Sequence, residues 1–169
     1  MKKRYIIMAF FMIAGLFNCP SVYVKKVEAK GKTYTISPNK IPKSVKKSSA
    51  YNKNTKNSLQ MQYYLKKLQK GGGRLVLKKG TYKICSTLFV PSNTTIELKE
   101  GAVLKKINKG KSNYKPTKNM FLLCSYKNRN KTNVYKKYNG PQNIKFIGHG
   151  SKSIIDLSYI KGAHGVSGS

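Results

Sequence analysis

Short apolar runs separated by polar turns dominate the middle of the chain. Four such runs, separated by segments that contain glycine or a Pro-Ser-Asn turn, lie at residues 75–77, 88–90, 95–98 and 102–104. Alternate residues of a strand point to the same side, so Leu75 and Leu77 share one face of their run, and Ile96 and Leu98 share one face of theirs. The pattern predicts consecutive short β-strands.

Similar apolar segments recur farther along. Val76 is followed by Ile96, Leu122 and Phe146, at separations of 20, 26 and 24 residues, and this spacing is typical of the coils of a solenoid rather than of a sandwich. Later strands are predicted at 120–124, 143–148 and 153–157. The run at 120–124 is apolar throughout, which predicts a strand covered on both faces. The pattern stops after residue 157, so we expect about three coils of an incomplete solenoid, the front portion of a longer protein.

A helix is predicted immediately before the strands. Asn54 or Thr55 offers an N-cap, Gly71 ends the segment, and an apolar stripe recurs at helical spacing: Met61, Tyr64, Leu65 and Leu68. Residues 30–53 are rich in Lys, Ser and Asn, contain two prolines and lack apolar periodicity, which predicts a flexible lead-in. Residues 54–169 are therefore expected to form the folded unit.

The first 29 residues have the layout of a secretory signal peptide. Lys2, Lys3 and Arg4 precede an apolar run at 5–17, and small residues near Ala29 suit a cleavage point. The run is shorter than the roughly 20 residues of a membrane span, so no stable span is expected after cleavage. An uncleaved anchor and a lipoprotein modified at Cys19 are the alternatives. The leading prediction is a secreted, extracellular or cell-wall-associated protein.

The glycines and strand starts carry a family resemblance. Three glycines end the predicted helix, and R-x-V, G-T-Y-x-I and S-N-T-T-I-E-L-x-x-G-A-x-L follow in order. From residue 54 to 157 the chain resembles the N-terminal region of right-handed parallel β-helix proteins of the polygalacturonase and pectate-lyase-like group. The resemblance implies an all-β, single-stranded solenoid whose N-terminal helix covers the open first coil. The members of this group differ in activity, so hydrolase, lyase and non-catalytic protein all stay open.

The charge is extreme. The chain has 35 basic and 4 acidic residues and a formal charge of +31, and removing residues 1–29 leaves +27. A field of this sign favours an acidic polysaccharide or an anionic cell-wall polymer as partner. Nucleic acid is not expected, because arginine is scarce, no recognition motif occurs and the leader directs the chain outside the cell. A simply solvated lysine-rich surface is the plainer interpretation.

The segment 125–142 combines charge with aromatic rings. Its cations are Lys127, Arg129, Lys131, Lys136 and Lys137, and its rings are Tyr126, Tyr135 and Tyr138. Cations for carboxylates and rings for sugar faces are what a saccharide groove uses, so this segment is the best candidate for polymer contact. An ordinary loop protruding between coils is the alternative.

Carboxylates are too scarce for a recognisable catalytic pair. Glycoside hydrolysis normally needs two or more, one of them protonated, and residues 30–169 have three. Glu97 points away from the apolar face of its strand and Glu100 sits in the next turn, so both are expected to be solvated. Asp156 resembles a structural aspartate of the β-helix group. The catalytic residues therefore stay unknown and are expected beyond Ser169.

The histidines and cysteines do not add a site. Gly148-His149-Gly150 matches a polygalacturonase string, but it lies in an earlier turn than that motif, so we interpret it as structural. His164 has no supporting motif. Cys85 and Cys124 either pair or remain buried thiols, and we favour buried thiols. No cofactor or metal ligand set is recognisable.

Two functions remain open from the sequence. The leading hypothesis is part of a secreted β-helix protein that acts on acidic polysaccharide. The alternative is a non-catalytic, basic surface or wall protein that binds polyanions.

Overall fold

The computed structural model describes residues 31–131, 139–159 and 164–168. The predicted signal peptide lies outside these ranges. Strands predominate over helices, in the following order: β1 (Lys32–Ile36), α1 (Lys43–Lys46), α2 (Lys56–Leu68), β2 (Gly73–Leu77), β3 (Gly80–Ile84), β4 (Leu88–Phe89), β5 (Thr94–Leu98), β6 (Ala102–Lys106), β7 (Asn119–Leu123), the 3-10 turn η1 (Tyr126–Asn128), β8 (Lys145–Gly148), β9 (Ile154–Asp156) and β10 (His164–Gly168).

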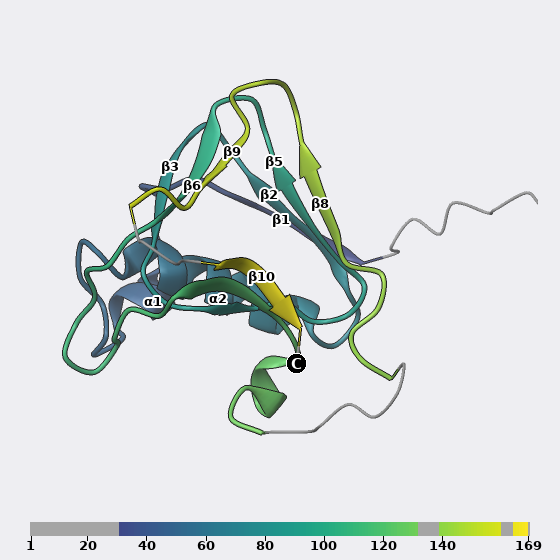
Figure 1. Ribbon diagram of the computed structural model, residues 1–169, viewed down its shortest axis with the longest axis horizontal. Coiled ribbons are helices and arrows are strands. Elements are labelled where there is room, and N and C mark those ends of the chain that lie inside the picture. Colours follow the sequence, from purple (N-terminus) through teal and green to yellow (C-terminus); the bar gives the residue numbers. More distant parts are fainter. Residues whose placement is uncertain (1–30, 132–138, 160–163, 169) are drawn as a thin grey trace, which may run out of the picture.

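The strands form three parallel sheets. Sheet A has the order β1-β2-β5-β8, sheet B the order β3-β6-β9, and sheet C the order β4-β7-β10. From β2 onward, successive strands enter sheets A, B and C in turn. Figure 1 shows the three sheets along three sides of the molecule, with α1 and α2 behind the lower side. The expected all-β character with parallel pairing is confirmed.

The interior is built from alternate strand residues in register. Leu75 of β2 lies beside Ile96 of β5, and Ile96 lies beside Phe146 of β8. In sheet B, Tyr82 lies beside Leu104. All of these except Phe146 are fully buried, and with the apolar residues of sheet C and α2 they form one hydrophobic cluster. Burial of this apolar surface is the main force that holds the three sheets together.

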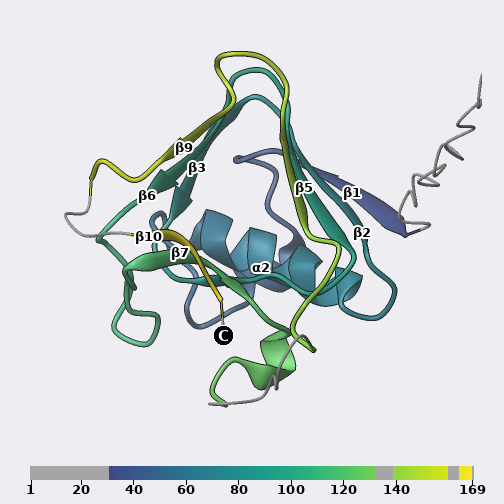
Figure 2. The ribbon, with the colours of Figure 1, turned by 45° about the vertical axis from the view of Figure 1, so that its right-hand side comes forward.

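Helix α2 covers one end of the sheets. It packs against β2, β3 and β4, one strand from each sheet (Figure 2). Met61, Leu65 and Leu68 are buried on that side, and Thr55 is the N-cap. At the other end the Gly72 amide donates to the Leu68 carbonyl at 2.7 Å with a φ of +68°, a conformation that glycine adopts without strain. The predicted helix, its start and its glycine stop are confirmed.

Five elements were not predicted: β1, α1, β3, η1 and β10. β3 lies between two of the predicted runs, and η1 lies in the segment predicted as a contact loop. β1 and α1 lie in residues 30–53, so the expectation of a flexible lead-in is wrong there. β1 has a single buried residue, Ile36, and its place is set by parallel pairing with β2 rather than by its own pattern. β10 follows residue 157, where the apolar pattern ends, and it pairs with β7.

The predicted repeat also needs correction. Ile96 and Phe146 are neighbours in sheet A, but Val76 lies beside Glu97 on the other face, and Leu122 pairs with Phe89 in sheet C. Residues at equivalent positions of one sheet are separated in the sequence by three strands and their loops, and the loops differ in length. The spacing between apolar segments therefore does not tell which sheet a segment belongs to. The strand at 119–123 is also less covered than predicted, because Leu122 and Leu123 are only half-buried.

Candidate functional site

Glu97 lies at the centre of a charged cluster on the outer face of sheet A. One carboxylate oxygen lies 2.5 Å from Lys99 Nζ and 2.9 Å from His149 Nε2, and the other lies 3.1 Å from an Arg74 guanidinium nitrogen. These side chains cover the carboxylate so that Glu97 is 3% exposed, and the expectation that it is solvated is wrong. The hydrogen bond from Lys99, with added attraction from Arg74 and His149, lowers the pKa of Glu97.

We expect Glu97→Gln to lower the free energy of unfolding at pH 7 by about 1–2 kcal/mol, because three cationic or basic groups lose their carboxylate. The depressed pKa of Glu97 means that its contribution is complete above the ordinary value of 4.5 and is lost as the pH falls through the folded-state value. Denaturant titrations at several pH values from 7 to 3 should therefore show the free energies of unfolding of the parent and of Glu97→Gln converging as the pH falls. Glu100→Gln, an exposed control, should change the free energy of unfolding little. If the difference in free energy of unfolding between Glu97→Gln and the parent stays constant with pH, the stabilising role of the ionised Glu97 is contradicted.

The other two carboxylates of the described residues have structural surroundings. Glu100 is exposed, as predicted, and its carboxylate lies against Gly150, where an added Cβ would lie 1.8 Å from an oxygen. Asp156 accepts hydrogen bonds from the Ser158 hydroxyl and amide and pairs with Lys105 Nζ at 3.1 Å. The Ser158 bonds and Lys105 hold the pKa of Asp156 at about 2. The lowered pKa of Asp156 does not favour the protonated state that a general acid requires.

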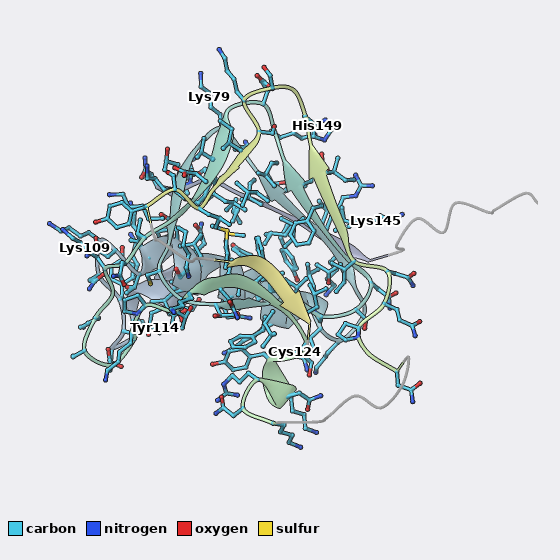
Figure 3. All side chains as sticks on the ribbon, in the orientation of Figure 1. Lys79, Lys109, Tyr114, Cys124, Lys145 and His149 are labelled. Atoms are coloured by element: carbon cyan, nitrogen blue, oxygen red, sulfur yellow. The ribbon has the colours of Figure 1, made fainter. Side chains whose placement is uncertain are left out.

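The Gly-His-Gly string forms a turn, as predicted. Gly148 ends β8, the His149 amide donates to the Leu98 carbonyl at 3.0 Å, and Gly150 has a φ of +88°. The turn places the His149 imidazole on the Glu97 carboxylate. Figure 3 labels His149 near the end of β8. The sequence analysis missed this pairing because the two residues are 52 positions apart in the chain. His164 lies in β10.

Both described cysteines are buried free thiols, which confirms the favoured prediction. Burial raises the pKa of each thiol, so neither resembles an activated nucleophile. Cys85 instead serves the fold: its amide donates to the Ser58 hydroxyl at 2.9 Å, which joins β3 to α2. Within the described ranges, His, Cys, Asp and Glu side chains do not gather in groups of three that could hold a metal ion.

Lys106 is fully buried at the end of β6. Its ammonium donates to the carbonyls of Cys85 at 3.1 Å and Asn119 at 2.9 Å and lies 3.4 Å from the Thr117 hydroxyl. It thereby joins the end of β3 to the start of β7 at the edge of the loop 107–118. Burial lowers the pKa of Lys106 to about 8, because the charged form loses its hydration.

We expect Lys106→Met to raise the free energy of unfolding at pH 7 by about 1–2 kcal/mol, since methionine fills similar space without a buried charge. The Cys85 and Asn119 carbonyls keep other donors, the Thr117 amide and the Thr87 hydroxyl. The folded-state pKa near 8 lies below the ordinary 10.5, so the parent should gain stability between pH 8 and 10.5 and the variant should not. Lys83→Met is the exposed control. If Lys106→Met is less stable than the parent by the same amount at pH 7 and at pH 10, the proposed cost of burying the Lys106 charge is contradicted.

A lysine and tyrosine pocket lies beside α2 at the covered end of the sheets. It has a volume of about 530 Å³, and its lining residues come from β1, the C-terminal half of α2 and the turn after it: Lys32, Tyr34, Tyr63, Lys66, Lys67 and Lys70. β1 extends sheet A beyond β2, so Tyr34 reaches the helix, where its ring centroid lies 5.0 Å from that of Tyr64. The pocket has no acidic residue in its lining.

The cations of this region are held over aromatic rings. Lys67 Nζ lies 4.5 Å from the centre of the Tyr63 ring and within 6 Å of the Tyr34 and Tyr64 rings. Lys66 Nζ lies 3.6 Å from the centre of the Tyr126 ring, and the Arg129 guanidinium lies 4.2 Å from the same centre. Cation–π contacts of this kind fix ammonium positions without neutralising their charge.

A second pocket is linked to the first by one ring contact, because its lining includes Tyr64, which packs on Tyr34 of the first pocket. It has a volume of about 670 Å³ and is lined by Thr35, Ile36, Ser37, Lys40, Tyr64, Lys78 and Lys79. We call the two pockets together the cap groove. Its lining combines seven lysines and three tyrosines, without a carboxylate. The arrangement can pair anionic groups with ammonium groups and place an apolar ring face against a tyrosine.

The predicted contact segment contributes less than expected to this groove. Tyr126 and Arg129 pack with Lys66, beside the groove, and residues 132–138 lie outside the described ranges. The sequence analysis did not identify the cap groove, because it assigned β1 to a lead-in and α2 only to a covering role. The adjacent pairs Tyr63-Tyr64 and Lys66-Lys67 on the predicted helix were the available indication.

No protein-family model, curated protein or solved structure matches the chain. Among the residues that the structure describes, no helix is both long and apolar enough to span a bilayer.

Proposed function

We propose that this chain is a secreted right-handed parallel β-helix protein that binds acidic polysaccharide through the cap groove. The β-helix assignment is supported by the cyclic order in which strands enter three parallel sheets and by α2 across one end. The binding assignment is supported chiefly by one observation: seven lysines and three tyrosines, without a carboxylate, line two pockets that are linked by the Tyr34–Tyr64 ring contact. A uronic-acid polymer offers the matching alternation of carboxylates and sugar faces.

Binding is a better proposal for the described residues than hydrolysis. Hydrolysis needs a carboxyl group that is protonated at working pH, and such groups have raised pKa values. Here the pKa values of Glu97 and Asp156 are lowered by their cationic and hydroxyl neighbours. Glu97 and Asp156 are therefore not suited to act as the general acid of a hydrolysis, and a wall-associated binding protein fits the described residues equally well.

The experiment is a titration of the full chain with three polymers of matched length: polygalacturonate, its fully methyl-esterified form and polyacrylate. Polygalacturonate should bind tightest, because the ester lacks charge and polyacrylate lacks sugar faces. Its affinity should fall steeply from 0.02 to 0.15 M salt, since the groove is open to solvent and charges are screened over about 8 Å at the higher value. Equal binding of the ester would overturn the proposal, and equal binding of polyacrylate would reduce it to nonspecific polyanion binding.

A further inference from the structure

A third basic pocket lies apart from the cap groove, on the outer face of sheet B. It has a volume of about 390 Å³ and brings together four lysines from separate segments: Lys53 before α2, Lys83 on β3, Lys105 on β6 and Lys109 beyond β6. Lys83 and Lys105 are direct neighbours in the sheet register, and Asp156 of β9 follows Lys105 in the same row. Lys109 lies on the opposite side of the molecule from Lys145 of sheet A (Figure 3).

The charges of this pocket are not balanced. Asp156 pairs with Lys105, whereas Lys53, Lys83 and Lys109 have no ion pair with a carboxylate in residues 31–131 and 139–159. Adjacent ammonium groups on neighbouring strands repel one another. A bound anion would relieve that repulsion and would receive several charge-assisted hydrogen bonds.

The donors of the pocket indicate the chemical class of the anion. Beside the ammonium groups, the lining offers the Asn54 amide and the Tyr159 hydroxyl, and it lacks the cluster of rings found in the cap groove. Ammonium groups act as point charges that suit compact, multiply charged oxyanions. We propose that this pocket is a binding site for a phosphate group, carried either by inorganic phosphate or by a phosphodiester polymer.

Asp156 makes the proposal sharply testable. Its pKa near 2 keeps it ionised at neutral pH, where it occupies Lys105 and repels an incoming phosphate. Asp156→Asn should therefore tighten phosphate binding about 3- to 10-fold, whereas Lys83→Gln should weaken it by a similar factor. Lys127→Gln, an exposed change in η1 that removes the same charge, should leave the affinity unchanged.

The experiment measures binding of inorganic phosphate and of poly(glycerol phosphate) to the full chain by calorimetry at 0.05 M salt. Binding of inorganic phosphate alone would identify a free-anion site, and much tighter binding of the polymer would identify a phosphodiester ligand. Equal losses in Lys83→Gln and Lys127→Gln, with no gain in Asp156→Asn, would overturn the proposal. If Asp156→Asn does not fold, the comparison of the two lysine variants decides. Phosphate binding that persists in a chain with glutamine at Lys66, Lys67 and Lys70 separates this site from the cap groove.

Discussion

Leu65→Ala is expected to lower the free energy of unfolding by about 3 kcal/mol, the typical cost of removing a fully buried leucine side chain and leaving a cavity. Leu65 is 0% exposed, on the face of α2 that covers one strand from each sheet. Without this cover the ends of the three sheets would expose apolar side chains and unpaired backbone. The loss should therefore affect the whole cooperative unit rather than α2 alone.

Urea unfolding followed by circular dichroism measures the effect. Leu59→Ala is a matched control, because Leu59 lies on the same helix and is only half-buried, and it should cost clearly less. Equal losses in the two variants would mean that α2 does not cover the core as described. A loss confined to helical signal, with the strands unfolding at the parent's midpoint, would contradict the role of α2 in stabilising the sheets.

Replacing Lys66, Lys67 and Lys70 together by glutamine is expected to weaken polygalacturonate binding by roughly 10- to 100-fold. Each solvent-exposed charge contact contributes about 0.5–1 kcal/mol to the binding free energy. The sum over three contacts corresponds to a change in Kd of this size. All three lysines line the cap groove, and two of them are placed over tyrosine rings. Their loss removes the positive side of the groove while leaving the core of α2 intact.

The control for this variant has the same net charge. Lys115, Lys118 and Lys152 are exposed and lie outside the three basic pockets, so their combined replacement by glutamine lowers the overall field equally. We expect this control to weaken binding no more than about 3-fold, through reduced long-range attraction. If both triple variants lose the same affinity, the polymer is held by net charge rather than by the cap groove.

The core strands could be predicted because their residues alternate locally. Leu75 with Leu77 and Ile96 with Leu98 define strand faces by themselves, and Gly71 and Gly72 mark the helix end. β1 could not be predicted in the same way, since its partner β2 lies about 40 residues later and the pairing satisfies its backbone without an apolar pattern. Strand pairing between distant segments is a tertiary property that local propensity does not contain.

The candidate site was less predictable than the fold. The net charge indicated an anionic partner, but the location of the groove depends on β1 lying beside α2, and that contact was not foreseen. Glu97 was expected to be solvated because its position faces away from the core. Its burial results from His149 and Arg74, whose proximity arises only when three strands of sheet A are in register.

Lysine acetylation of the full chain, with and without oligogalacturonate and read by peptide mass spectrometry, tests the central claim most directly. We expect protection concentrated at the cap groove, at Lys32, Lys66, Lys67 and Lys70, with Lys115, Lys118 and Lys152 modified as in the free protein. Protection spread evenly over the lysines, or concentrated outside the groove, would contradict the assignment of the cap groove as the polysaccharide site.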